Sequence, residues 1–146
     1  MRWLGLSAAC IALSRSAAAH ASRRVQAPAV AVLAGGCYWG VESVFRHVRG
    51  VRSATSGYAT PAIGGLGSGS PVEAVRIVYD PSRLSYRQIL AVFFSVVHDP
   101  TELNRQGPDV GAEYRSVVFV ASDRQRQVVR ALIDSLDAGP ARLYRH

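Results

Sequence analysis

Cys37 is the residue of this sequence best placed to act as a nucleophile. It follows Gly35 and Gly36, where an apolar run ends and a helical pattern begins. A thiol at the first turn of a helix faces unpaired N–H groups and the positive end of the helix dipole, and both favour the thiolate. The two glycines allow a sharp turn and close approach of a ligand to the backbone. We therefore expect Cys37 to be reactive, and not simply a small buried apolar residue.

Glu73 is the best candidate for the proton donor that such a nucleophile needs. It lies at the start of the alternating run 72–79 and shares one face of that run with Val75 and Ile77. Desolvation at the edge of an apolar face favours the neutral carboxylic acid, which can donate a proton. A solvated glutamate at a strand end is the alternative, and the context of Cys37 argues against it.

A cysteine hydrolase would need a basic partner beside the thiol, and none is well placed. His47 comes ten residues after Cys37, which is roughly 15 Å further along a helix. Glu42 lies about 140° round the same helix and faces away. His98 would have to approach from a polar connection. A hydrolase is therefore the weakest of the functions considered.

Apolar periodicity predicts the elements that position these groups. We expect buried strands at 29–35 and 117–121, further strands at 51–57 and 72–79, and helices that begin after Cys37, Ser85 and Ser122. Capping boxes are predicted at 85–88 and 122–125. The predicted core stripes of the three helices are Val41, Val44, Phe45 and Val48; Ile89, Val92, Phe93, Val96 and Val97; and Val129, Leu132, Ile133 and Leu136. The order β-α-β-β-α-β-α is that of an α+β, ferredoxin-like two-layer sandwich.

Two connections separate these elements. Residues 59–71 are rich in Gly, Pro and Ser and precede a strand instead of a helix, so they form a loop and no phosphate cradle. Residues 98–114 are densely polar, and a connection of this length in a compact domain is usually functional or disordered. The polar groups of this connection and of the residue after it are His98, Asp99, Asn104, Arg105, Gln106, Asp109, Tyr114 and Arg115.

The basic charge is concentrated at the N-terminus. All 17 basic residues are arginine and the net charge is +7, whereas residues 25–146 hold 13 arginines against 10 carboxylates, a net charge of +3. We therefore expect no nucleic-acid partner. Residues 1–24 combine a positive start, the apolar stretch 3–13 and small residues up to Ala21, which is typical of a secretory signal.

We consequently expect export to the periplasm or the extracellular space, with organelle import as the alternative. Residues 25–146 would then form one domain. No apolar run approaches the roughly 20 residues needed to span a bilayer. Cys10 would leave with the signal, so that Cys37 would be the single thiol of the mature chain.

The segment 35–42 (GGCYWGVE) resembles the signature of the peptide methionine sulfoxide reductase A (MsrA) family, in which Gly-Cys-Phe-Trp-Gly is usual. Four further blocks resemble that family in the right order. They are 53–58 (SATSGY), 73–81 (EAVRIVYDP), 98–101 (HDPT) and 104–114 (NRQGPDVGAEY), the last followed by Arg115-Ser116. The resemblance covers about residues 29–136, nearly all of the expected mature chain.

This resemblance implies reduction of the S-epimer of methionine sulfoxide, free or in proteins, as a repair of oxidative damage. Cys37 would attack the sulfoxide sulfur, and Glu73 would protonate its oxygen. Tyr114 would hydrogen-bond the same oxygen, and Asp109 would organise the site. Neither a metal nor a bound cofactor is implied.

Three aromatic residues would bind the substrate. Tyr38 and Trp39 would surround its methyl group, with Tyr58 also in the substrate site, because sulfur and aromatic rings attract each other. Cys37 would finish as a sulfenic acid, which an external thiol would reduce. That thiol would be a thioredoxin-type protein or dithiothreitol. We expect the enzyme to be a monomer.

The sequence departs from the family pattern in three ways. The loop 59–71 is short, lacks the family's second substrate-contacting tyrosine, and has Ser70-Pro71-Val72 where Thr-Gly-His is usual. No resolving cysteine follows Cys37. Family sequences continue beyond the equivalent of His146, so we expect a C-terminally shortened domain. A catalytically impaired relative that keeps the fold without turnover is therefore the main alternative.

Overall fold

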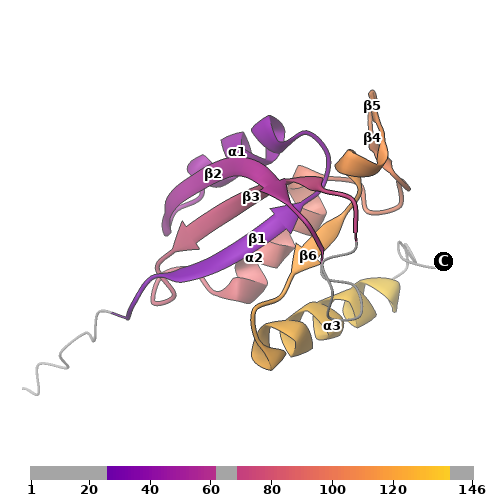
Figure 1. Ribbon diagram of the computed structural model, residues 1–146. Coiled ribbons are helices and arrows are strands. Elements are labelled where there is room, and N and C mark those ends of the chain that lie inside the picture. The colour runs from indigo at the N-terminus through magenta and orange to yellow at the C-terminus, as the bar shows by residue number, and fades with distance from the viewer. Residues whose placement is uncertain (1–25, 62–68, 139–146) are drawn as a thin grey trace, which may run out of the picture.

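The computed structural model describes residues 26–61 and 69–138 (Figure 1). Its main sheet contains β1 (Ala29–Ala34), β2 (Val51–Ala59), β3 (Val72–Tyr79) and β6 (Val117–Phe119). The strands lie in the order β2-β3-β1-β6, and every neighbouring pair is antiparallel. A split βαβ repeat produces this order, so the predicted ferredoxin-like sandwich is confirmed. The expected signal, residues 1–24, and residues 62–68 of the loop lie outside the described residues.

The helices of the described part are α1 (Tyr38–Arg46), α2 (Tyr86–Val92) and α3 (Asp123–Asp137). Figure 1 shows α1 and α2 behind the sheet, with α3 below it. The core lies between these layers and includes the fully buried residues Leu33, Val75, Ile77, Phe45, Ile89 and Phe93. None of the helices in the described ranges is long and apolar enough to cross a membrane.

The helix that begins with α2 ends in a π-helical turn, η1 (Phe93–Val97). Phe93 is fully buried, whereas Val96 is 66% exposed. The prediction that Val96 belongs to the core stripe was therefore wrong. It assumed that the 3.6-residue period continues to Val97, but a π turn spaces its hydrogen bonds five residues apart and shifts which side chains face inward.

Two predictions near β6 also need correction. The strand expected at 117–121 ends at Phe119, and its residues are only half-buried because β6 is an edge strand. The capping box at Ser85 is confirmed, but only half of the one at Ser122 forms. Ser122 Oγ accepts the Gln125 N–H, while the Gln125 side-chain oxygen accepts from Ala121 instead of from Ser122.

The polar connection 98–114 has structure of its own. It contains a short hairpin of β4 (Arg105–Gln106) and β5 (Asp109–Val110), followed by the 3-10 helix η2 (Ala112–Tyr114). In Figure 1 the hairpin stands at the end of the molecule where β1 leads into α1. There the Gly36 N–H donates to the Tyr114 carbonyl at 3.0 Å. The connection is therefore attached directly to the turn that carries Cys37.

Candidate active site

Cys37 occupies the N-cap position of α1, as its place after the glycine pair predicts. Its carbonyl accepts hydrogen bonds from the N–H groups of Gly40 and Val41, at 3.1 and 3.3 Å. Its thiol makes no capping hydrogen bond, is not in a disulfide and is partly exposed. The site therefore presents a free, partly exposed thiol at the N-terminus of α1.

The Glu73 carboxyl lies beside the residue that follows Cys37. Its Oε2 accepts the backbone N–H of Tyr38 at 2.9 Å. Glu73 is only 8% exposed, at the start of β3 and in line with the buried Val75 and Ile77. The structure thus places the Glu73 carboxyl at the residue next to Cys37, the thiol that sequence reasoning selected.

Three aromatic rings extend from this point across an open surface. Tyr58 on β2 is the register partner of Glu73, so their side chains lie on the same face of the sheet. The Tyr58 ring meets Tyr38 edge-on, with centroids 5.8 Å apart, and Tyr38 stacks on Trp39 at 6.1 Å. Trp39 is 72% and Tyr58 67% exposed. These rings offer an apolar surface beside the carboxyl.

Tyr114 reaches the same site from η2. Burial, followed by the charges of Glu73 and Asp109, raises the pKa of Tyr114, and Cys37 contributes in the same direction. The neighbouring Tyr38, then burial and the charge of Glu73, likewise raise the pKa of Tyr58. Both phenols therefore stay protonated at neutral pH and can donate a hydrogen bond to an oxygen atom. Asp109, half-buried on β5, lies close enough to Tyr114 to influence it.

Sequence reasoning did not find Ser56, which joins β2 to α1. The Ser56 N–H and hydroxyl both donate to the Glu42 carboxylate, and the hydroxyl also donates to the Tyr38 carbonyl at 3.4 Å. Glu42 pairs in addition with Arg46 at 2.6 Å. The bonds from Ser56 and the charge of Arg46 lower the pKa of Glu42. The i,i+4 spacing of Glu42 and Arg46 was the only local signal of this arrangement.

Neither histidine considered as a base is hydrogen-bonded to Cys37 in the described part of the chain. His47 bonds the Ser43 carbonyl on the exposed side of α1. His98 is 8% exposed, and its ring lies 4.1 Å from that of Phe93, centroid to centroid. Its Nδ1 bonds the Phe93 carbonyl at 3.1 Å. Burial lowers the pKa of His98. This histidine is a core residue, and the geometry gives no support to a hydrolase.

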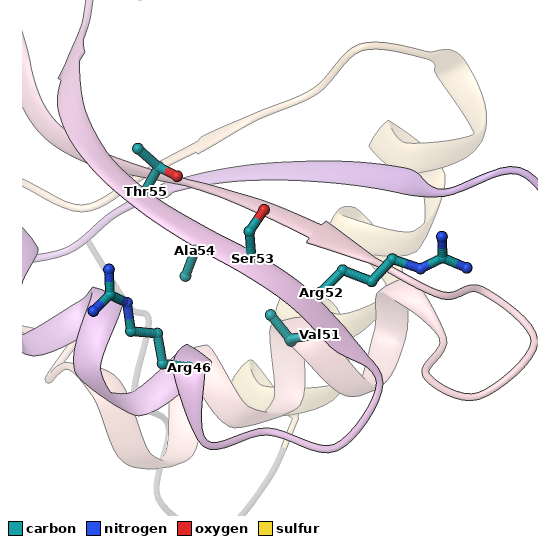
Figure 2. Close-up of a pocket in the computed structure, with 6 residues that line it drawn as sticks. All are labelled: Arg46, Val51, Arg52, Ser53, Ala54 and Thr55. Carbon is teal, nitrogen blue, oxygen red and sulfur yellow. The ribbon is translucent and has the colours of Figure 1, made fainter.

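A separate hollow of about 330 Å³ lies between the end of α1 and β2 (Figure 2). It is lined by Arg46 and residues 51–55, none of which belongs to the site around Cys37. Figure 2 shows Arg46 and Arg52 pointing away from each other. Arg46 pairs with Glu42, and Arg52 approaches Asp80 at 3.5 Å. Both cations are thus already neutralised, which leaves little attraction for an anionic ligand.

Within residues 26–61 and 69–138, no cluster of three or more His, Cys, Asp or Glu side chains could hold a metal ion. The site around Cys37 presents four kinds of group for chemistry. These are a thiol at a helix N-terminus, a buried carboxyl, protonated phenols and an aromatic surface.

Fold and site together define a ferredoxin-like α+β domain with a cysteine-centred site. The chain belongs to the peptide methionine sulfoxide reductase family, whose family model matches residues 29–142. The family resemblance found in the sequence is thereby confirmed.

Individual relatives agree with this assignment. The chain is 49% identical over 121 residues to the peptide methionine sulfoxide reductase MsrA 2 of Mesorhizobium japonicum, covering 78% of this chain and 61% of the relative. It is 46% identical over 118 residues to MsrA 2 of Synechocystis sp., covering 76% of this chain and 55% of the relative. The chain thus spans between 55% and 61% of the length of these two relatives.

Solved structures are also similar. Methionine sulfoxide reductase A of Corynebacterium diphtheriae superimposes with a TM-score of 0.62 at 31% identity, covering 81% of this chain and 61% of that one. Mxr1 from Saccharomyces cerevisiae in its reduced form gives a TM-score of 0.66 at 27% identity, with coverage of 75% and 68%.

Proposed function

We propose that this protein reduces the S-epimer of methionine sulfoxide, free or protein-bound, to methionine, with Cys37 as the nucleophile. The observation that carries the proposal is the bond between Glu73 and the Tyr38 N–H at 2.9 Å. It holds a buried acid next to the residue that bears the thiol. Membership of the family supports the choice of substrate.

The proposed reaction transfers one oxygen atom. The Cys37 thiolate attacks the sulfoxide sulfur, and the proton that neutralises the sulfoxide oxygen comes from Glu73. The oxygen then passes to the Cys37 sulfur, and both the S–O bond of the substrate and the S–S bond formed by the attack break. The products are methionine, reduced by two electrons, and a Cys37 sulfenic acid, oxidised by two electrons. Tyr114 stabilises the oxygen by hydrogen bonding, and Asp109 orients Tyr114.

Three directions in the proposed site support a preference for one epimer. The oxygen must point to Glu73 and Tyr114, the methyl group to Tyr38 and Trp39, and the sulfur to Cys37. Tyr58 extends the aromatic surface under the substrate chain. A tetrahedral sulfoxide sulfur meets all these requirements in only one of its two configurations.

We propose that an external thiol regenerates Cys37. One thiol displaces water from the sulfenic acid to form a mixed disulfide. A second thiol attacks this bond, releasing Cys37 as a thiol and the reductant as a disulfide. A thioredoxin-type protein or dithiothreitol supplies both thiols.

We further propose that residues 1–24 direct export of a single monomeric domain, residues 25–146, with organelle import as the alternative.

Turnover of a peptide containing S-methionine sulfoxide, with dithiothreitol as reductant, tests this function. The full chain should produce methionine, whereas Cys37→Ser should not. The R-epimer peptide serves as the control and should not react. Turnover that survives Cys37→Ser would remove the proposed nucleophile. A folded wild-type protein without turnover would favour the catalytically impaired alternative.

A further inference from the structure

We infer that Gln106 is a positioning residue whose side chain holds the backbone of Gly36, and through it Cys37, in place. The inference rests on the proposed function, because it concerns the nucleophile of that reaction. Gln106 lies on β4, far from Cys37 in the sequence, which indicates it only as one of the polar groups of the connection 98–114 and gives it no role of its own.

The contact is made on the side of Gly36 where other residues carry a side chain. Gly36 has φ of +85°, a backbone conformation that favours glycine. A Cβ atom on Gly36 would lie 2.7 Å from both the Cβ and the Cγ of Gln106. The Gly36 N–H meanwhile donates to the Tyr114 carbonyl at 3.0 Å. The backbone before Cys37 is therefore held by the methylene groups of Gln106 and by one hydrogen bond.

The Gln106 side chain is itself held by its amide. Its Oε1 accepts the Asp99 N–H at 2.6 Å, and its Nε2 donates to the Asp99 carbonyl at 3.2 Å and to Glu102 Oε2 at 2.7 Å. The same Glu102 oxygen accepts the Gly107 N–H at 2.7 Å. Both amide hydrogens are used inside the loop, so that the amide anchors the side chain and the methylene groups face Gly36.

Gly35 is packed in a similar way by the same region of the chain. A Cβ atom there would lie 2.9 Å from the Phe93 ring and 3.0 Å from the His98 ring. Both glycines before Cys37 thus lie against side chains of residues 93–106. Reaction rate is sensitive to such support, because a misplacement of about 1 Å can cost roughly 100-fold.

Two substitutions distinguish the role of the Gln106 amide, which anchors the side chain, from that of its methylene groups, which contact Gly36. Gln106→Ala removes the Cγ and the amide, whereas Gln106→Met keeps the Cβ and Cγ and removes only the amide. Gln127→Ala, an exposed glutamine on α3, is the matched control. Two measurements are made on each full-length protein. These are kcat and KM with dithiothreitol, and the rate of Cys37 alkylation by iodoacetamide at neutral and at alkaline pH.

We expect Gln106→Ala to lower kcat by about tenfold or more with KM changed by less than about twofold, since the thiol is misplaced while the aromatic surface remains. Alkylation should slow at neutral pH and slow less at alkaline pH. In Gln106→Met, kcat and the alkylation rate at neutral pH should each fall by about threefold. In Gln127→Ala, neither should change.

An unchanged kcat and alkylation profile in Gln106→Ala would overturn the inference. So would a loss in Gln106→Met as large as that in Gln106→Ala, because the contact through the methylene groups would then be irrelevant. If Gln106→Ala does not fold, the alkylation profile of Gln106→Met decides, and an unchanged profile overturns the inference. Alkylation needs no turnover, so a wild-type protein inactive toward sulfoxide would contradict the proposed function and leave this test intact.

Discussion

Glu73 and Tyr38 are joined by a 2.9 Å hydrogen bond between a side-chain oxygen on β3 and the first backbone N–H of α1. The first N–H groups of a helix have no partner within the helix, and here one of them is satisfied by a buried carboxyl. The bond engages the Oε2 atom of Glu73. The carboxyl is therefore anchored at the residue that follows Cys37.

Replacing Glu73 by Gln should separate anchoring from proton transfer. The amide oxygen can still accept the Tyr38 N–H, but the side chain has no proton to transfer. We expect kcat to fall by about 100-fold or more, with a melting temperature close to that of the wild type. Steady-state reduction of a sulfoxide peptide measures kcat, and thermal unfolding measures the melting temperature. A kcat within twofold of wild type would remove Glu73 as the acid.

The Tyr114 hydroxyl should matter more than that of Tyr58. Tyr114→Phe keeps the ring and the carbonyl that binds Gly36 but loses the donor to the sulfoxide oxygen, so kcat should fall by about 100-fold. Tyr58→Phe keeps the aromatic surface, and kcat/KM should change by less than about threefold. Equal losses in the two variants would contradict the separate roles assigned to them.

The raised pKa of Tyr114 also predicts how wild-type activity depends on pH. Because the pKa is raised, the hydroxyl remains a donor beyond the ordinary tyrosine value of about 10. The pH profile of kcat should therefore show no decline due to this group below about pH 10. The kcat profile of Tyr114→Phe should have the same shape as that of the wild type up to about pH 10. A difference in shape below about pH 10 would contradict a raised pKa of Tyr114.

His98 should make the protein less stable as the pH falls below neutrality. Burial lowers the pKa of His98 in the folded state, so the unfolded chain binds the proton more tightly. This contribution to stability is present above the unfolded value of about 6.5 and is lost as the pH falls toward the folded value, at up to about 1.4 kcal/mol per pH unit.

His98→Phe should flatten the decline in the free energy of unfolding between about pH 7.5 and 5.5, as measured by urea denaturation. The exposed His47 supplies the control, and His47→Gln should retain the wild-type slope. Glu42, Asp80 and Asp99 have lowered pKa values and titrate at more acidic pH, so they do not obscure the comparison. An unchanged slope in His98→Phe would show that another group titrates in this range.

The π turn at η1 predicts opposite effects for two residues that the helical pattern treats alike. Phe93→Ala should lower the free energy of unfolding by about 3–5 kcal/mol, because Phe93 is fully buried. Val96→Ala should change it by less than about 0.5 kcal/mol, because Val96 is exposed. Urea denaturation measures both changes. A large loss of unfolding free energy in Val96→Ala would show that Val96 belongs to the core stripe after all.

Local patterns were sufficient for most of the fold. The strand at 72–79, the capping box at Ser85 and the helix start after Cys37 were all predicted from residues within one element. The errors arose where tertiary context changed a local rule. Val96 was misplaced by a π turn, and the strand at 117–121 lost burial because it lies at the edge of the sheet.

The sequence by itself determined which residues have the chemistry, namely the thiol at a helix start and the acid at a strand start, because backbone periodicity and residue type act over short distances. Only the tertiary structure decided which groups meet. The Tyr38–Glu73 bond joins positions 35 residues apart, and the contact of Gln106 with Gly36 joins positions 70 residues apart (106 − 36). Such contacts depend on how β3 and the 98–114 connection pack around α1, and no pattern within one element records that packing.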